Sequence, residues 1–250
     1  MARWLGLMTA LFLLPPLLAV ATHVLEGQAH GRWYEARRDS SQQAPDPATT
    51  PEAVVQVYAA RAFGWRGALG VHTWIAWKAE GATTWRRIEV TGWAVRYGNG
   101  NAIRVSQGNP DGYWFGSRPR LLGEVRGIAA ARAIAGLWRA AKSYPYGQEY
   151  RLWPGPNSNT FIAHLLRETP DLRVELPPTA VGKDYIPGGE VWAEAPSGTG
   201  YQLSAAGLAG VMLAAEEGVE INLLGLTVGL DLSPPALKLP GLGRIGWSEH

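Results

Sequence analysis

Three side chains in the sequence can together perform nucleophilic catalysis: the hydroxyl of Ser158, the imidazole of His72 and the carboxylate of Glu89. A serine hydroxyl is a poor nucleophile until a base takes its proton during the attack, and a histidine oriented by a carboxylate is the usual base. The chain contains no cysteine, which excludes a thiolate nucleophile and cysteine-bound metals. We therefore predict Ser158 as nucleophile, His72 as general base and Glu89 as the orienting group.

Ser158 lies in the segment 153–161, with the sequence Trp-Pro-Gly-Pro-Asn-Ser-Asn-Thr-Phe, between a predicted strand at 149–153 and a predicted helix at 159–168. The two prolines end the strand, and the glycine between them permits a tight reversal of the chain. Ser158 shares a face with the apolar residues that follow it at helical spacing. The hydroxyl is therefore predicted to point inward at a helix N-terminus, where backbone N–H groups can hold an anion.

Asn157 and Asn159 flank this serine, and either residue can support chemistry or only shape the turn. An amide side chain beside the nucleophile can donate a hydrogen bond to a developing oxyanion. The plainer alternative is that Asn157 or Ser158 caps the helix, since both residue types accept hydrogen bonds from the first backbone N–H groups. The sequence leaves an oxyanion hole and a simple cap both open.

His72 and Glu89 lie on two segments, 69–77 and 83–93, that are rich in β-branched and aromatic residues and predict a β-hairpin. With a symmetric turn at 79–82, the two residues stand directly opposite each other. An imidazole beside a carboxylate has its tautomer fixed and its basicity raised. The alternative is an ordinary cross-strand polar pair on a solvated face.

Alternation along the two strands predicts which side chains share a face of the hairpin. One face carries Val71, Thr73, Ile75, Trp77, Ile88 and Val90, and the other carries His72, Trp74, Arg87 and Glu89. A Gly-, Asn- and Pro-rich loop at 97–119 follows, and a loop of this length often has a binding role or is mobile. A cleft beside the catalytic groups is expected to be lined by Trp74, Trp93, Trp114 and Trp153.

Residues 4–21 are apolar without a single charge, which predicts either an uncleaved transmembrane anchor or a signal peptide. The small residues Ala19 and Ala21 resemble a cleavage site, so both alternatives stay open. We assign residues 1–23 to this segment and 24–50 to a polar, partly disordered linker. Either alternative sends the rest of the chain outside the cytoplasm.

Two helices are predicted in the remainder of the core. Thr50 is a cap residue, Pro51 is favourable at the first helical position, and Gly64 is a stop signal, which together predict a helix over 51–63. Apolar side chains at helical spacing predict another helix over 127–142.

The composition changes at residue 190, where a C-terminal extension over 190–250 is predicted. The apolar, Gly-rich segments 200–215 and 219–232 predict a β-hairpin, with a short helix within 204–215 as the alternative. An extended tail follows over 234–246. We expect the extension to pack on the core, although its apolar surface also suits a membrane or a partner.

Charge argues against some classes of partner. The chain has 23 basic and 21 acidic residues, a net charge of +2, which does not predict nucleic-acid binding.

Motifs for metals and cofactors are also missing from the sequence. It has no His-x-x-x-His pattern and no carboxylate–histidine cluster at metal-ligand spacing. No Gly-rich turn precedes Lys183 at the spacing of a phosphate loop. We expect no metal and no cofactor.

Several blocks of the sequence resemble an uncharacterised bacterial envelope family, known as domain of unknown function 3750. The resemblance covers residues 45–246 and implies no known activity. Its characteristic blocks lie at 64–67, 71–75, 153–161, 182–185 and 196–200.

A more distant resemblance is to circularly permuted papain-like hydrolases of the NlpC type. In those enzymes a histidine stands early in a strand, as His72 does, and an Asn-Cys-Asn-x-Phe block begins a helix. The block 157–161, Asn-Ser-Asn-Thr-Phe, is similar position by position, with serine in place of cysteine. The resemblance implies an α+β core over 51–189, in which helices pack on an antiparallel sheet. A helix dipole favours a thiolate but cannot ionise a serine hydroxyl, so Ser158 would need His72 within hydrogen-bond reach.

Two functions follow. The first is a hydrolase or acyltransferase that acts on an amide or ester in the cell envelope through Ser158, His72 and Glu89. The second is a catalytically inactive module that binds a peptide, glycan or lipid in the same cleft. For both we expect a single-pass protein of the bacterial inner membrane with its main domain in the periplasm, or a periplasmic protein after signal cleavage.

Overall fold

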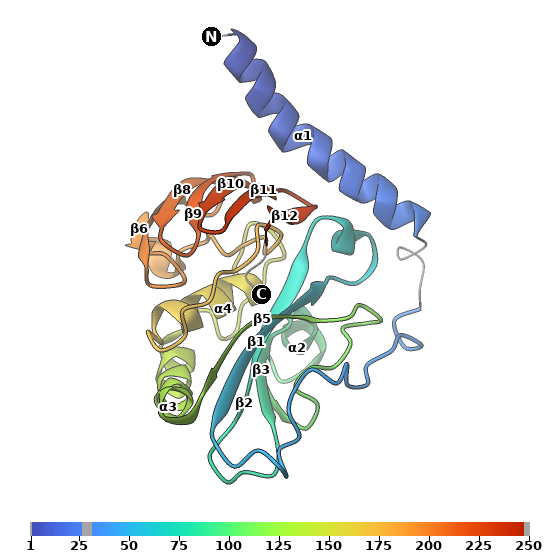
Figure 1. The fold of residues 1–250 in the computed structure, drawn as a ribbon. Helices are drawn as coiled ribbons and strands as arrows, with labels where there is room; N and C mark the ends of the chain where they lie inside the picture. Colours follow the sequence, from blue (N-terminus) through green and yellow to red (C-terminus); the bar gives the residue numbers. More distant parts are fainter. Residues whose placement is uncertain (1, 27–31, 248–250) are drawn as a thin grey trace.

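The computed structural model describes residues 2–26 and 32–247, which form two antiparallel sheets and a few helices (Figure 1). The α+β class is confirmed. Met1, residues 27–31 of the predicted linker and residues 248–250 of the predicted extension lie outside the described residues.

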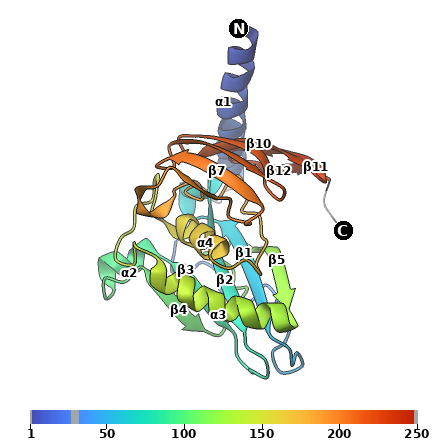
Figure 2. The same ribbon diagram turned by 90° about the vertical axis from the view of Figure 1, so that its left-hand side faces the viewer.

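The first sheet has five strands in the order β4-β3-β2-β1-β5. Its strands are β1 Val54–Arg61, β2 Val71–Lys78, β3 Arg86–Val90, β4 Ile103–Gln107 and β5 Arg120–Arg126. The helices of this part are η1 Gly64–Ala68, α2 Gly92–Tyr97, α3 Gly127–Ser143 and α4 Ser158–Arg167, followed by the short turn η2 Pro187–Gly189. Helices α3 and α4 cover one face of the sheet (Figure 2), where Trp77 of β2 meets Trp138 of α3 edge to face. The helices predicted at 127–142 and 159–168 are therefore confirmed.

The helix predicted over 51–63 is wrong, because residues 54–61 form strand β1 between β2 and β5. This strand is buried on both faces, so its apolar residues form a nearly continuous run whose period cannot separate helix from strand. Its one polar interior residue, Gln56, is fully buried and donates to Glu124 Oε2 at 2.5 Å.

Two other predicted elements also differ. The strand predicted at 149–153 is irregular, because the Arg151 N–H donates to Pro156 O within the turn at 2.8 Å instead of joining a ladder. The loop predicted over 97–119 contains strand β4, which pairs with β3 along its whole length.

The predicted hairpin exists as β2 and β3, but its register is shifted by two residues, since Ile75 pairs with Ile88 instead of Arg86. A shift of two preserves the side-chain faces, whereas a shift of one would reverse them. Ile75, Trp77, Ile88 and Val90 accordingly pack in one core with α3 and α4. His72 and Glu89 still meet, along a diagonal.

The opposite face of the sheet is covered by the segment 32–50 and by the loop 108–119. Asp111 is fully buried and accepts hydrogen bonds from Ser40 Oγ at 2.8 Å and from the Gln43 N–H at 2.6 Å. Trp74 donates through its ring N–H to Pro110 O at 2.7 Å. These contacts tie the two segments to the sheet.

The second sheet has seven strands in the order β12-β11-β10-β9-β8-β7-β6 and replaces the single hairpin predicted at the C-terminus. Its strands are β6 Trp192–Glu194, β7 Gly200–Ala205, β8 Ala209–Ala214, β9 Gly218–Leu223, β10 Leu226–Leu232, β11 Pro235–Leu239 and β12 Gly243–Gly246. The alternative helix within 204–215 is thereby excluded, and the predicted tail over 234–246 is β11 and β12.

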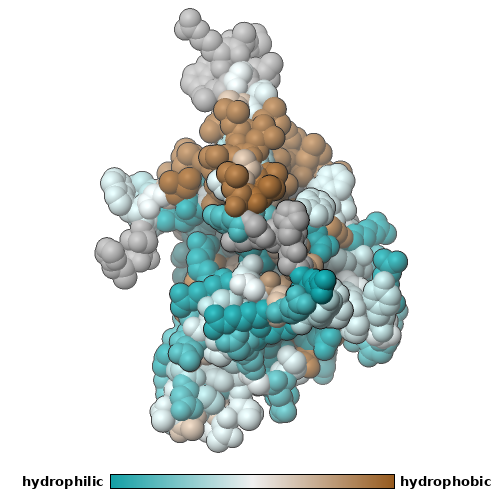
Figure 3. All heavy atoms as spheres, turned by 90° about the vertical axis from the view of Figure 1, so that its right-hand side faces the viewer, coloured by the Kyte–Doolittle hydropathy of each residue, from teal (hydrophilic) through white to brown (hydrophobic). Residues whose placement is uncertain are grey.

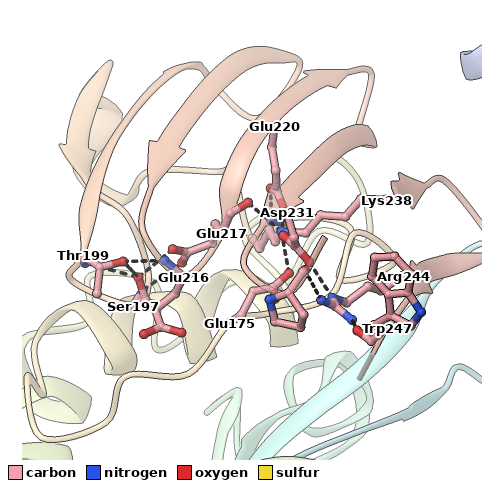
Figure 4. Close-up of polar contacts among 12 residues, drawn as sticks. Glu175, Ser197, Thr199, Glu216, Glu217, Glu220, Asp231, Lys238, Arg244 and Trp247 are labelled. Atoms are coloured by element: carbon pink, nitrogen blue, oxygen red, sulfur yellow. Dashed lines mark hydrogen bonds and ion pairs between the residues drawn. The ribbon is translucent and has the colours of Figure 1, made fainter. Parts of the chain in front are cut away.

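The face of this sheet that packs on the core is polar (Figure 4). Lys238 is fully buried, and its ammonium lies 2.6 Å from Glu175, 3.0 Å from Glu220 and 2.6 Å from Asp231. Glu220 also forms a buried ion pair with Lys183 of the core. Because the carboxylates come from both the sheet and the core, these ion pairs hold the two together.

Helix α1 Ala2–Leu25 includes a stretch, Met8–Leu25, that is long and apolar enough to cross a membrane or to serve as a signal sequence. Its C-terminal part docks on the domain. His23 is buried, and its Nε2 lies 3.0 Å from Gly64 O. A side-chain carbon at Gly241 would lie 2.7 Å from Ala19 Cβ, so only glycine permits this close approach.

Candidate functional site

A buried histidine–carboxylate–arginine cluster lies on the face of the first sheet that is opposite to α3 and α4. His72 Nε2 lies 2.6 Å from Glu89 Oε2, and Arg87 Nη2 donates to the same oxygen at 2.7 Å. His72 is 6 % exposed, and Arg87 is also buried. Strands β2 and β3 thus position the base and its orienting group from neighbouring chain segments, as the hairpin predicts.

The ionisation of this cluster fixes the tautomer of His72. Burial alone would raise the pKa of the Glu89 carboxyl, but the charge of Arg87 and the hydrogen bond with His72 outweigh it and lower that pKa to about 2. Burial lowers the pKa of His72 below its ordinary value, even though Glu89 acts in the opposite direction. At neutral pH the carboxylate is charged and the imidazole neutral, so Nε2 carries the hydrogen and donates it. Nδ1 then holds a lone pair and can act as a base.

Aromatic rings enclose the imidazole. Trp114 stacks on His72 with 3.7 Å between ring centroids and 11° between planes, and Trp74 stacks at 5.9 Å. The Arg87 guanidinium lies 3.9 Å from the Trp74 ring centroid. The loop 108–119 therefore supplies a cover for the histidine, and in this conformation the ring is nearly closed off from solvent.

The start of α4 is organised by the side chain of Asn157. Its Oδ1 accepts hydrogen bonds from the backbone N–H groups of Asn159 at 2.9 Å and Thr160 at 3.2 Å. Its Nδ2 donates to Leu152 O and Val181 O, both at 3.0 Å. This amide is thus the helix cap, and both of its donor hydrogens are already engaged.

The first turn of α4 fills an open edge of β2. Strand β3 pairs with β2 only at residues 75–77, so the beginning of β2 is left without a partner on that side. Asn159 occupies this edge: its Nδ2 donates to Val71 O at 3.0 Å, and its Oδ1 accepts from Thr73 Oγ1 at 2.9 Å. The residues immediately before and after His72 are therefore both held by Asn159.

Ser158 begins α4, is 5 % exposed, and its hydroxyl has no hydrogen bond within the described part of the chain. Because Thr73 contacts α4, alternation directs the His72 side chain to the other face of β2. No hydrogen bond joins Ser158 to His72 in the described ranges. The two groups come from adjacent backbone but can meet only around the open edge of β2.

The four predicted cleft tryptophans separate into two groups. Trp74 and Trp114 lie against His72. Trp93 is exposed and packs beside Tyr97, and Trp153 is half-exposed and donates to Leu224 O at 2.9 Å. The first pair therefore belongs to the histidine cluster, while Trp153 links the turn before Ser158 to the C-terminal sheet.

Other residues also contribute to the site. The sequence places Arg87 on the His72 face, and the structure adds its hydrogen bond to Glu89. The spacing of two residues between Arg87 and Glu89 along a strand is the signal for this contact. Thr73 and Val181 hold the asparagines of α4. Within the described residues, no group of three or more His, Asp or Glu side chains is arranged to hold a metal ion.

Comparison with known proteins yields one match. The model of the family described as "Protein of unknown function (DUF3750)" matches residues 52–185 of this chain. This range contains the whole five-stranded sheet, α3 and α4, and with them His72, Glu89 and Ser158. No curated protein and no solved structure matches the chain.

Proposed function

Because the chain belongs to the DUF3750 family of proteins of unknown function, which assigns no activity, we propose from the site itself that it is a serine-dependent hydrolase or acyltransferase of the cell envelope. The proposed substrate is an amide or ester, and the proposed core is papain-like, with the nucleophile at a helix start and the base on a neighbouring strand.

The observation that carries this proposal is that two uncommitted groups lie near one strand edge. The Nε2 of His72 donates to Glu89 at 2.6 Å, which leaves Nδ1 as a free base. The hydroxyl of Ser158 stands at the start of a helix that is tied by Asn159 to Val71, the residue before His72. A free hydroxyl, an oriented neutral imidazole and a helix N-terminus are the parts that acyl transfer requires.

In the proposed reaction, Ser158 Oγ forms a bond to the substrate carbonyl carbon while its proton passes to His72 Nδ1. Glu89 stabilises the resulting imidazolium, and the backbone N–H of Ser158 stabilises the oxyanion. The next two N–H groups of α4 already donate to the Asn157 side chain. Collapse of the intermediate breaks the bond to the leaving amine or alcohol, which takes the proton from His72. Water or another acceptor then releases the acyl group by the same steps and restores the serine.

The reaction requires the imidazole and the hydroxyl to approach each other around the open edge of β2. The cover formed by Trp114 must shift for this to happen, so the proposal includes a local movement of the loop 108–119. Many enzymes have loops that open to admit the substrate and then close over it, which excludes water during the reaction.

A second candidate function is a catalytically inactive module that binds a peptide, glycan or lipid. The closed state of His72, stacked beneath Trp114 at 3.7 Å between centroids, favours this candidate. If that stacking is permanent, His72 cannot act as a base for Ser158, and the cleft only binds its ligand.

A fluorophosphonate probe on the purified full chain distinguishes the two candidates. Such probes form a covalent bond with an activated serine and ignore ordinary surface hydroxyls. We expect labelling of the wild type that is lost in Ser158→Ala and retained in Ser106→Ala, which removes an exposed hydroxyl on β4. Folded wild-type protein that takes no label would favour the binding module, and label that persists in Ser158→Ala would contradict the assignment of the nucleophile.

For localisation, we propose a single-pass protein of the bacterial inner membrane with both sheets in the periplasm. The docking of Ala19 and His23 on the domain supports an anchor that is kept, because Ala19 belongs to the cleavage-like motif and His23 closely follows it. An intact mass of the membrane-extracted protein that includes residues 2–21 is expected. A protein that begins at Thr22 would show that the segment is a cleaved signal.

A further inference from the structure

The C-terminal sheet has its polar and apolar faces exchanged relative to a sheet that packs on a protein core. Along β9, the buried positions are Glu220 and Asn222, and the exposed positions are Val219, Ile221 and Leu223. A sheet with one solvated face normally turns its apolar side chains inward and its polar ones outward. The buried side is stabilised here by ion pairs with the core, which leaves most of the apolar side exposed.

The exchange extends across the sheet and is not confined to one strand. Cross-strand pairing aligns two outward rows that run from strand to strand. One row consists of Tyr201, Leu213, Val219, Leu230, Leu237 and Ile245, and the next consists of Trp192, Leu203, Val211, Ile221 and Val228. The only charged side chain aligned with either row is Glu194, on the short edge strand β6.

Aromatic residues mark the two ends of this surface. Trp192 and Tyr201 stack on each other near the β6 edge, with 4.9 Å between ring centroids. Trp247 follows β12 at the other edge and is 73 % exposed. Aliphatic side chains in the centre with Trp and Tyr at the margins are typical of protein surfaces at the interface between lipid and water.

Helix α1 lies against the same side of the sheet. It contacts β10 and β11, and Phe12 helps to line a groove of about 530 Å³ with outward residues such as Leu203, Val211 and Ile221. The N-terminal part of α1 extends away from the domain on the outer side of the sheet (Figures 1 and 2). In the space-filling view, hydrophobic residues gather at this end of the molecule, while the opposite end is mostly hydrophilic (Figure 3).

We infer that the outer face of the C-terminal sheet lies flat on the surface of the lipid bilayer that α1 enters. The apolar rows contact the boundary between headgroups and acyl chains, and the aromatic residues occupy the headgroup level. The sheet does not span the bilayer, because its open edges would leave backbone groups without hydrogen bonds in hydrocarbon. This inference uses the anchor proposed above but is independent of any catalytic role of Ser158.

A bilayer explains the surface better than a second protein. Helix α1, which passes along this face, is apolar enough to enter lipid. A membrane that α1 enters therefore lies beside the sheet. Interfaces between proteins usually carry several polar groups. The only polar groups in the two outward rows are the Tyr201 hydroxyl and the Trp192 indole N–H, with the Glu194 carboxylate at the edge.

The absence of cysteine permits a direct test with single-cysteine variants of the full chain. Leu213→Cys and Leu230→Cys carry a polarity-sensitive fluorophore on the outer face, and both native side chains are exposed. Leu14→Cys on α1 serves as the positive control. Ile128→Cys on α3 is the matched control, because Ile128 is equally apolar and 78 % exposed. It lies in the layer of helices that covers the first sheet, away from the C-terminal sheet.

Each variant is reconstituted in phosphatidylcholine vesicles with and without bromine on the acyl chains. We expect brominated lipid to quench the label at positions 213 and 230 by at least half as much as at position 14, with no quenching at position 128. Quenching at position 14 without quenching at 213 and 230 would overturn the inference while the anchor stands. Labels at 213 and 230 that are shielded from water but unquenched, with a dimer in cross-linking, would show that a second copy covers the face.

Discussion

Replacing Lys238 with methionine should lower the free energy of unfolding by about 3–5 kcal/mol, the usual cost of removing one partner from a buried ion pair. The Lys238 side chain is fully buried, and its ammonium contacts Glu175, Glu220 and Asp231. It also donates to Glu217 O at 2.6 Å. Methionine fills much of the same volume but leaves three carboxyl groups without their common cation.

The loss should depend on pH, because the orphaned carboxyl groups can escape the penalty by taking up protons. Burial already raises the pKa of Glu175 above its ordinary value, and Lys238 is the main group that opposes this. Without the lysine that pKa rises further, so the folded state of the variant takes up protons more readily than the unfolded state. The variant should therefore recover part of its stability as the pH falls toward 5.

Urea unfolding of the full chain in detergent, monitored by tryptophan fluorescence, measures this effect. Arg132→Met is the matched control, since Arg132 forms an ion pair with Asp171 on the surface, at 2.7 Å. Exposed pairs contribute little, so the control should unfold almost like the wild type. If Lys238→Met were no less stable than this control, the ion pairs would not hold the sheet to the core.

Replacing His72 with glutamine should slow the reaction of Ser158 with a fluorophosphonate by about 10²–10⁴-fold, the usual contribution of a general base. Glutamine is close in size and can still donate a hydrogen bond to Glu89, so the polar cluster stays satisfied. It cannot accept the proton of the serine. The rate should fall while the unfolding transition changes little.

His164→Gln provides the control for this substitution. His164 lies on α4, and its Nε2 is 3.0 Å from Ala140 O, so it is a partly buried histidine with a structural contact. Its replacement should leave the labelling rate unchanged. Equal effects of the two substitutions on rate, or a His72 variant that reacts as fast as the wild type, would show that the imidazole does not serve Ser158.

The sequence predicts the local geometry of the site better than its assembly. Residue types and short-range periodicity predict a helix that begins beside Ser158, a cap at Asn157 or Ser158, and the meeting of His72 with Glu89. The pairing survives a two-residue error in register because faces repeat every two residues. Whether Ser158 and His72 meet depends on how far β3 separates from β2, which no local pattern encodes.

The two larger errors have a common cause. Strand β1 is buried on both faces, so its apolar run carries no period that distinguishes it from a helix. The second error is the single hairpin predicted where the C-terminal segment forms a sheet of seven strands. The polar face of that sheet is held by Lys183 and Lys238, through ion pairs that no local pattern predicts. Both features depend on partners that are distant in the chain.

The pH dependence of the fluorophosphonate reaction tests most directly whether His72 is the base for Ser158. The reaction rate of the wild type should fall with decreasing pH through one ionisation whose midpoint lies below 6.5, because burial lowers the pKa of His72 from that ordinary value. In Glu89→Gln the midpoint should move to still lower pH, since the carboxylate no longer raises that pKa. A rate that simply grows with hydroxide concentration, and does so equally in wild type and His72→Gln, would contradict the proposed mechanism.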